Sequence, residues 1–349
     1  MPRPCLAALN APPRVGVALP GAVHPRDAGR LAALAEQAGC DAVWVLDVRR
    51  DPYLLSAAAL TGTTRIEVGT NVAVAFARSP TVTATTAWDL AQWSGGRFVL
   101  GLGSQVGPTL EARFGIAADH PAPRMRDYVR AVRACFEAFR RGYGRYEGDF
   151  YRIRRPALQP GAEALEHDPQ VYLAAVNPVM TAIAGEVADA LAAHSFTTEA
   201  YLREVLRPAL ERGARRAGRP APGVLLQLVV APTREEAAQQ MIAYAVPAYR
   251  RVLDHHGLGE VADRVMAASK DGRRSEARQL IDERCLDLLG VVVGDDLAAL
   301  RQGIERWRPH ADRLSLSVPW FGIDAAEQLR QAERLIELVA GLQDRPVTR

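Results

Sequence analysis

One histidine in this chain is well placed to move a proton. His194 lies near the end of the apolar run Leu191–Ser195, and an unperturbed imidazole titrates close to neutrality, which suits general acid–base chemistry. A structural histidine whose ring nitrogens are satisfied by hydrogen bonds is the commoner explanation at such a position. His194 is therefore a candidate whose role depends on its surroundings.

Two other polar groups follow apolar runs. Asp47 comes after Ala42–Leu46, where an ion pair with a neighbouring arginine explains a loop acid as well as a ligand contact does. Asn177 and Pro178 follow the run Val171–Val176 and begin a helical pattern, so they are typical of an N-cap and a first helical residue. The free amides of such a helix could bind phosphate, although ordinary capping accounts for the pair equally well.

Glycines punctuate two of the apolar runs. The stretch Gly69–Ala75 is long and small-sided, as if a bulge interrupted a strand, and a bulge can aim backbone at a ligand. Gly101 and Gly103 could let a flat ring approach, but their spacing does not match a dinucleotide-binding loop. His255, His256 and His310 have no companion carboxylates or thiols at ligand spacing, so no metal site is expected.

Positioning these groups requires a framework of strands and helices. Near-continuous apolar runs suit parallel strands that helices bury on both faces. The eight runs are Val15–Leu19, Ala42–Leu46, Ile66–Ala75, Phe98–Leu102, Val171–Val176, Leu191–Ser195, Val224–Val230 and Leu314–Val318. Helical patterns separate them, so the chain is predicted to be α/β and to form a (β/α)8 TIM barrel with insertions, an open doubly wound sheet being the alternative.

The predicted organisation is a single domain over residues 1–349. Three stretches exceed ordinary βα loops and are interpreted as insertions, at about residues 105–124, 144–169 and 245–294. Within the second, Gly148 and Asp149 between aromatic residues indicate a small hairpin. The third is helical and charged, and it is expected to cover the barrel mouth or to form an oligomer contact.

Composition argues against several classes of function. The formal charge is only +3, and the excess arginine is spread along the chain with Lys270 as the single lysine, so no nucleic-acid surface is expected. Cys5, Cys40, Cys135 and Cys285 are far apart, which favours reduced thiols. Without a secretory signal pattern or a long apolar run, the protein is predicted to be cytoplasmic with no membrane partner.

Several motifs in order along the chain resemble a known family. The segment from Ser94 to Gly103 resembles the S-G-G-R-F-x-L-G-L-G signature of luciferase-like monooxygenases and coenzyme F420-dependent oxidoreductases. The blocks 68–70, 78–80, 171–178 and 184–189 reinforce it, and the blocks 88–90, 113–115 and 121–126 look like the F420-dependent subgroup. The similarity runs from Val15 to about Pro319.

The resemblance implies a cofactor across the barrel mouth. It implies a non-prolyl cis peptide bond between Asn71 and Val72 behind the deazaflavin ring, and a phosphate near the start of the helix after the fifth strand. The residues that would contact the cofactor on this basis are Asp47, Asn71, Val72, Ala73, Ser104, Gln105, Ala175, Val176, Asn177, Pro178, Val179 and Met180.

The chain also departs from part of that family. Where sugar-phosphate dehydrogenases of the superfamily carry a histidine and a glutamate, the matching positions here are Val48 and Val106. That substrate is therefore not expected, and His194 and Gln105 remain the catalytic candidates for polarising or protonating a small-molecule substrate. The predicted function is hydride transfer between F420 and a small organic substrate; an FMN-dependent monooxygenase and a non-catalytic F420-binding protein are the alternatives. Members of the family often pair as homodimers.

Overall fold

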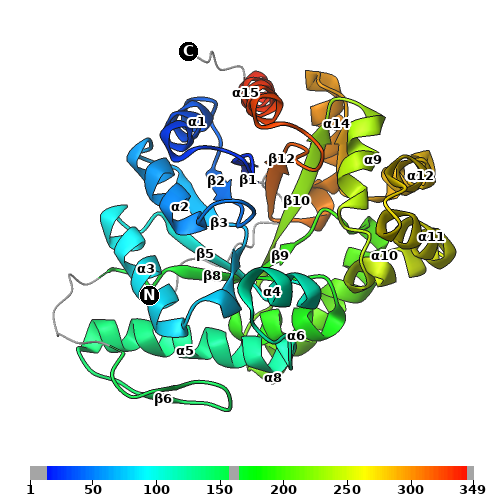
Figure 1. Cartoon of the computed structure of the whole chain (residues 1–349). Coiled ribbons are helices and arrows are strands. Elements are labelled where there is room, and N and C mark those ends of the chain that lie inside the picture. Colours follow the sequence, from blue (N-terminus) through cyan, green and yellow to red (C-terminus); the bar gives the residue numbers. More distant parts are fainter. Residues whose placement is uncertain (1–13, 157–164, 344–349) are drawn as a thin grey trace.

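The computed structural model describes residues 14–156 and 165–343, which form a closed parallel barrel (Figure 1). Its eight strands are β1 (Arg14–Ala18), β2 (Ala42–Val45), β3 (Glu67–Thr70), β5 (Phe98–Gly103), β8 (Gln170–Ala175), β9 (Ala190–Ala193), β10 (Gly223–Ala231) and β12 (Arg313–Ser317). β12 pairs with β1 and β10 pairs with both β9 and β12, so the sheet closes on itself. The predicted TIM barrel is confirmed and the open sheet is excluded.

Helices surround the barrel in the expected alternation (Figure 1). The helices that follow the barrel strands are α1 (Pro25–Gln37), α2 (Pro52–Thr61), α3 (Pro80–Trp93), α5 (Pro121–Arg141), α6 (Pro178–Val187), α8 (Arg207–Arg216), α9 (Arg234–Ile242), α14 (Leu297–Trp307) and α15 (Ala325–Leu342). Between β9 and α8 lie the short α7 (Glu199–Tyr201) and a π-helical turn at Leu202–Leu206. These helices leave the strand ends as the open faces of the barrel.

Helix α1 illustrates why these sequences fold as they do. The His24 side chain accepts a hydrogen bond from the backbone N–H of Arg26, and Pro25 occupies the first turn, where its missing N–H costs nothing. Leu31 and Ala35 recur on one face and are fully buried. Periodic burial of this kind holds each helix against the strands.

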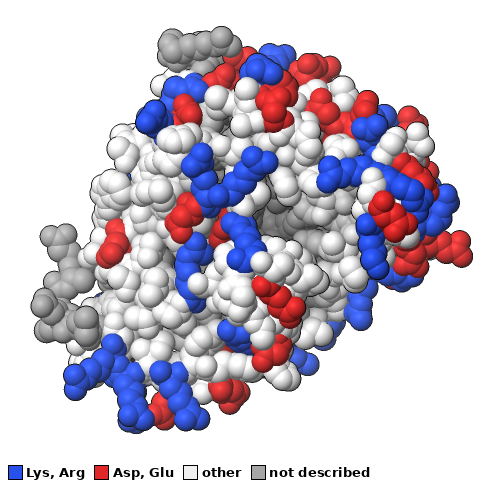
Figure 2. Space-filling view, in the orientation of Figure 1, with Lys and Arg blue, Asp and Glu red and all other residues white. Residues whose placement is uncertain are grey.

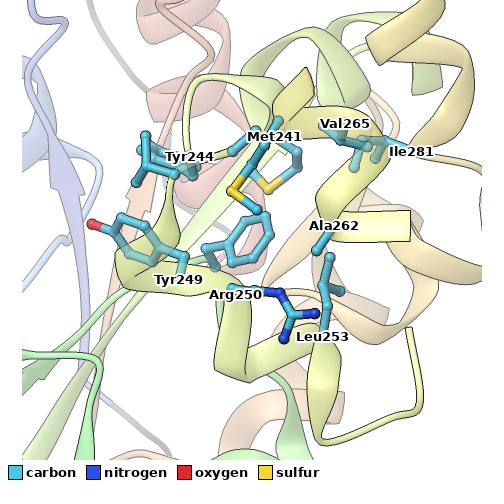
Figure 3. Close-up of a pocket in the computed structure, with 12 residues that line it drawn as sticks. Met241, Tyr244, Tyr249, Arg250, Leu253, Ala262, Val265 and Ile281 are labelled. Atoms are coloured by element: carbon cyan, nitrogen blue, oxygen red, sulfur yellow. The ribbon is translucent and has the colours of Figure 1, made fainter. Parts of the chain in front are cut away.

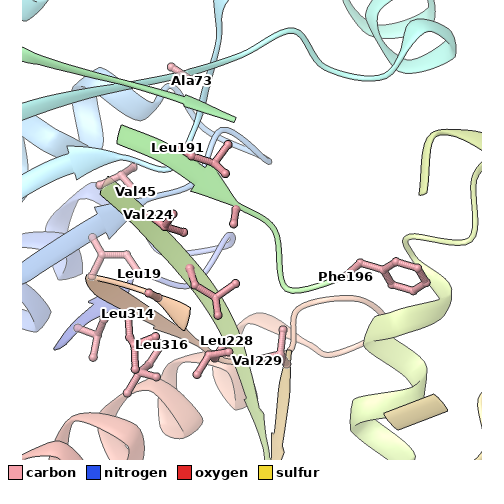
Figure 4. Packing of buried hydrophobic residues seen from close by; sticks show 14 of the residues in the cluster. Leu19, Val45, Ala73, Leu191, Phe196, Val224, Leu228, Val229, Leu314 and Leu316 are labelled. Carbon is pink, nitrogen blue, oxygen red and sulfur yellow. The ribbon is translucent and has the colours of Figure 1, made fainter. Parts of the chain in front are cut away.

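The core has two layers, one inside the barrel and one between strands and helices. The inner layer is small and includes Trp44, Val99, Tyr172 and Leu225. The outer layer is much larger, and Figure 4 shows part of it on β10 and β12, including Leu228 and Leu316. Strands buried on both sides explain the near-continuous apolar runs.

An ion pair between buried Arg313 and partly buried Glu67 lies at the N-terminal ends of the strands. The guanidinium of Arg313 lies 2.6 Å from the Glu67 carboxylate and donates a hydrogen bond of 2.9 Å to the Tyr172 hydroxyl. It also lies over the Trp44 ring, 5.2 Å from the centroid. Arg313 is only 2% exposed, so this charge depends on its partners for compensation.

The first two insertions build small elements beside the barrel. The first contains α4 (Gly107–Phe114). The second contains the predicted hairpin, β6 (Tyr146–Glu147) and β7 (Arg152–Ile153), which pair antiparallel; residues 157–164 lie outside the described part. Asp127 of α5 anchors the hairpin by accepting hydrogen bonds from the backbone N–H groups of Phe150 and Tyr151, at 2.7 and 2.9 Å.

The third insertion is helical and packs beside α9 (Figure 1). It contains a 3-10 turn at Pro247–Tyr249, then α10 (Arg250–Asp254), α11 (Gly259–Lys270), α12 (Arg274–Leu280), α13 (Glu283–Leu288) and β11 (Val291–Val293). β11 pairs in parallel with the end of β10, and β4 (Ala73–Val74) pairs with β5. Helix α11 ends at the exposed Lys270.

Neither a membrane span nor a disulfide occurs in the described ranges. Of their helices, none combines the length and apolar character needed to cross a bilayer. Cys40, Cys135 and Cys285 are free and buried, and Cys5 lies outside the described residues.

Candidate functional site

The polar candidates converge because they follow neighbouring parallel strands. Asp47 follows β2, Asn71 follows β3, Ser104 and Gln105 follow β5, and His194 follows β9. The C-terminal ends of the strands in a closed parallel barrel meet at one face, where the active sites of such barrels lie. Figure 2 shows the face seen in Figure 1 to be hollowed near its centre.

Asp47 is buried and partnered by arginines from distant parts of the chain. Its Oδ2 accepts hydrogen bonds from the backbone N–H of Val74 at 3.1 Å and from Arg78 at 3.3 Å. The Arg113 guanidinium lies 3.6 Å from Oδ1. The neighbouring Arg49 is exposed and makes no such contact, so the ion pair that the sequence suggested is present with different partners. Asp47 thus joins β2 to β4 and α4 at the rim of the mouth.

The break between β3 and β4 contains the expected cis peptide bond. The Asn71–Val72 bond is cis, and the Asn71 N–H donates to the Val45 carbonyl at 2.8 Å. The Asn71 side chain is 9% exposed, and its Nδ2 has no hydrogen-bond partner within the described part of the chain. A buried donor without a partner is uncommon in folded proteins, so this amide marks a place where a ligand acceptor would fit.

The two glycines of β5 make room for the neighbouring chain segment around the end of β3. A Cβ at Gly101 would lie 1.9 Å from the Thr70 carbonyl oxygen, and one at Gly103 would lie 2.7 Å from Val72 Cγ2. Thr70 Oγ1 also donates to the Gly101 carbonyl at 2.6 Å. The close approach of Thr70 and Val72 therefore explains why these positions carry no side chain. The expectation that a flat ring approaches here stays a prediction.

Gln105 turns its side chain back onto its own backbone. Its φ of +62° is rare for a residue with a side chain, and such conformations cluster at functional sites. The Gln105 Oε1 accepts from the Val106 N–H at 2.9 Å, and the Ser104 hydroxyl donates to the Gln105 carbonyl at 3.2 Å. The loop after β5 is thus held by local hydrogen bonds, with the Gln105 Oε1 already used.

The start of α6 is open. Asn177 occupies the N-cap position and Pro178 the first helical position, as the sequence predicts, but the Asn177 side chain makes no capping bond. Its Nδ2 donates instead to the Ala248 carbonyl of the third insertion at 3.0 Å, and its Oδ1 is buried without a described partner. The N–H groups of Val179 and Met180 in the first turn therefore remain available to an anion.

His194 lies against Tyr244, which precedes the third insertion, and against Tyr249 near its start. The ring centroids of Tyr244 and Tyr249 are 4.3 and 5.0 Å from that of His194. Burial lowers the pKa of His194 to about 4, so the ring is neutral near pH 7. His194 Nδ1 accepts from the Phe196 N–H at 2.9 Å, which places the proton on Nε2.

The sequence did not single out these aromatic neighbours. Phe196, Tyr244 and Tyr249 contact one another with ring centroids 5.7 to 6.2 Å apart, and all three line a pocket shown in Figure 3. The available signal was the aromatic residue after β9 together with two tyrosines five positions apart. In the described residues there is no cluster of three or more potential metal ligands.

The fold is a (β/α)8 barrel, and the polar candidates follow its strands at the C-terminal face. Residues 7–308 match the model of the luciferase-like monooxygenase family, and the chain belongs to that family.

The chain is similar both to uncharacterized proteins and to proteins described as F420-dependent. An uncharacterized protein of Mycobacterium tuberculosis is 38% identical over 276 residues, which cover 75% of this chain and 81% of that protein. A putative coenzyme F420-dependent oxidoreductase of the same organism is 28% identical over 345 residues, covering 90% of this chain and 96% of the relative. The solved structure of a coenzyme F420-dependent tetrahydromethanopterin reductase from Methanopyrus kandleri has a TM-score of 0.76 at 22% identity, covering 95% and 98% of the two chains, and thus shares the fold.

Proposed function

We propose that this protein is an F420-dependent oxidoreductase that transfers a hydride between the cofactor and a small organic substrate. The observation that carries the proposal is its similarity, over 90% of its length, to a putative coenzyme F420-dependent oxidoreductase. The cis bond at Asn71–Val72, which resemblance to F420-dependent enzymes led us to expect, supports it.

The residues at the mouth fit such a cofactor. The buried Nδ2 of Asn71 lacks an acceptor, and the first turn of α6 lacks a side-chain cap. In this proposal the N–H groups of Val179 and Met180 bind the cofactor phosphate, while Asn71 and the Ser104 loop contact the ring system. When bound, F420 supplies two-electron hydride chemistry at C5 of its deazaflavin ring.

The remaining candidates bind and orient the substrate. His194 is a neutral donor through Nε2, so it can polarise a substrate oxygen without changing its own charge. Gln105 has only its side-chain amide N–H groups left for the same purpose. Valines at positions 48 and 106 provide no acid or base, which argues against a sugar-phosphate substrate.

Cofactor selectivity tests the proposal directly. Purified protein is titrated with F420 and, separately, with FMN, while quenching of its tryptophan fluorescence is followed. Micromolar affinity for F420 with negligible FMN binding is the expected result. The reverse selectivity would overturn the proposal in favour of an FMN-dependent monooxygenase, which the description of the matched family favours as the second candidate.

A reduction assay separates the enzyme from a non-catalytic F420-binding protein. With F420 bound, a panel of alcohols and ketones is screened by the cofactor's absorbance in both directions of transfer. Turnover with any of them supports the proposal. Tight binding without any change in the cofactor's redox state across the panel would instead favour the binding protein.

A further inference from the structure

Gln240 of α9 is fully buried and uses both ends of its side-chain amide. Its Oε1 accepts hydrogen bonds from the backbone N–H groups of Trp320 at 2.7 Å and of Phe321 at 2.9 Å. Its Nε2 donates to the Tyr244 hydroxyl at 2.9 Å. Burying an amide costs free energy unless its polar atoms are hydrogen-bonded, so these three bonds hold the side chain in one orientation.

These bonds connect two segments that are distant in the sequence. Trp320 and Phe321 belong to residues 318–324, the mouth segment, which leads from β12 to α15 and so lies at the C-terminal ends of the strands. Tyr244 lies just beyond Ile242, the last residue of α9. The Gln240 amide therefore links the mouth segment to Tyr244.

The ring of Tyr244 is one of two aromatic rings that enclose His194. It stands nearly perpendicular to the imidazole, with an interplanar angle of 85° and ring centroids 4.3 Å apart. Perpendicular packing is a favoured arrangement of aromatic rings. Tyr249 contacts the imidazole at 5.0 Å and lies beside Tyr244, with centroids 5.8 Å apart (Figure 3). The place of the imidazole thus depends on where these two rings lie.

The hydroxyl is the end of Tyr244 that Gln240 holds. Burial raises the pKa of Tyr244 more than its hydrogen bonds, among them the one from Gln240, lower it, so the phenol is neutral near pH 7. The hydroxyl is the part of the side chain furthest from the backbone. A hydrogen bond at that point therefore limits how far the ring can move away from His194.

His194 presents a single N–H group. Its Nδ1 accepts from the Phe196 N–H at 2.9 Å, so the proton of the neutral ring is on Nε2. This N–H has no hydrogen-bond partner among residues 14–156 and 165–343. The rings of Tyr244 and Tyr249 that face the imidazole are uncharged near pH 7, because burial raises the pKa of both phenols. Packing, rather than an ion pair, thus sets where the Nε2–H lies.

We propose that Gln240 is a positioning residue, which binds the Tyr244 hydroxyl and so keeps His194 in place at the barrel mouth. Through the same amide it ties this arrangement to the mouth segment. The use of the His194 N–H on a substrate oxygen rests on the proposed hydride-transfer function. The placement of the imidazole does not, so the cofactor-free protein can test it.

Gln328 of α15 provides a matched control. It is also buried, and its Nε2 donates to the carbonyls of Ile323 at 2.8 Å and Trp320 at 3.3 Å. It therefore holds the same mouth segment, but within the described part of the chain it has no hydrogen bond to Tyr244. Gln240→Met and Gln328→Met each replace a buried amide with an apolar side chain of similar length. Both should lower stability, whereas only Gln240→Met should affect His194.

NMR titration of the cofactor-free protein with ¹⁵N-labelled histidine measures this effect. The His194 signal is the one that His194→Asn removes. In the wild type and in Gln328→Met the ring should stay neutral down to about pH 5, since its pKa is about 4. In Gln240→Met the ring should regain water, and its midpoint should rise by about one pH unit, a tenfold change in proton affinity.

An unchanged His194 midpoint in folded Gln240→Met, or an equal rise in Gln328→Met, would overturn the proposal. If Gln240→Met does not fold, Tyr244→Phe takes its place, because it removes the hydroxyl and leaves the bonds from Gln240 to the mouth segment intact. A rise of the same sign is then expected, and an unchanged midpoint has the same meaning.

Kinetics of the cofactor-loaded protein connect the placement to the reaction. Gln240→Met should lower kcat about tenfold with little change in KM, because a misplaced group costs rate more than binding. The double variant Gln240→Met/Tyr244→Phe should be no slower than Gln240→Met, since both changes remove one link. Multiplied losses in the double variant would overturn that link. Failure of the proposed function appears instead as absent F420 binding while the His194 midpoint still rises in Gln240→Met.

Discussion

Placing a negative charge in the first turn of α6 separates a phosphate site from an ordinary helix start. Val179 is the second residue of the helix and is 64% exposed, so a polar replacement needs no repacking. Val179→Asp adds a carboxylate beside the free N–H groups, and Val179→Asn adds a neutral side chain of the same shape. The pair differs only in charge.

The two effects of the carboxylate have opposite signs. On the free protein it interacts favourably with the helix dipole, which stabilises the fold by roughly 0.3–1 kcal/mol. On a bound phosphate it acts by repulsion: at a separation of about 6 Å and an effective dielectric constant of about 40, Coulomb's law gives about 1.4 kcal/mol per unit of phosphate charge. Val179→Asp should therefore bind F420 about tenfold more weakly than Val179→Asn while melting at the same temperature or higher.

Fluorescence titration of both variants with F420, at low salt and again with added salt, measures the difference. Because charges interact over a Debye length of about 10 Å at about 0.1 M ionic strength, added salt should reduce it. Equal affinity of the two folded variants, at every salt concentration, would refute a phosphate site at the start of α6.

Three further changes test other parts of the structure. Glu67→Gln leaves the buried Arg313 charge uncompensated and should lower the free energy of unfolding by roughly 3–5 kcal/mol in urea denaturation, and an unchanged midpoint would contradict the ion pair. Asp127→Ala removes the anchor of the β6–β7 hairpin, so trypsin should cut within residues 145–155 faster than in the wild type, at equal cleavage elsewhere. Because the folded pKa of His194 is about 4 and the reference value is 6.5, the unfolded chain takes up this proton first as pH falls. Stability should thus decrease below about pH 6.5 by at most about 3 kcal/mol, and His194→Asn, which can still accept from the Phe196 N–H, should reduce that loss; parallel pH profiles would contradict the assignment.

The barrel was predictable because burial on both faces leaves a strong mark on each strand. Each of the eight apolar runs overlaps a barrel strand. The run Ile66–Ala75 predicted one strand, but the chain forms two, β3 and β4, separated at the cis bond. The apolar content of a segment does not specify the isomer of a peptide bond. Strand β11 was missed inside the third insertion, since three valines make too short a pattern to distinguish from a helix.

The site was less predictable because its properties depend on residues that are distant in sequence. Arg78 and Arg113 lie 31 and 66 residues beyond Asp47, so no local spacing could name them as its partners. The Asn177 side chain makes no capping bond because its Nδ2 donates to the Ala248 carbonyl, 71 residues away in sequence. The pKa of His194 follows from burial that only the folded chain provides.

The single lysine provides one side chain that amine-directed reagents can modify selectively. Lys270 is exposed at the C-terminal end of α11, the helix that supplies Ala262 and Val265 to the pocket shown in Figure 3. Because the other basic side chains are arginine or histidine, an amine-directed fluorophore would modify this one side chain, apart from the main-chain amine. A dye attached there would label α11 of the third insertion without any engineered cysteine.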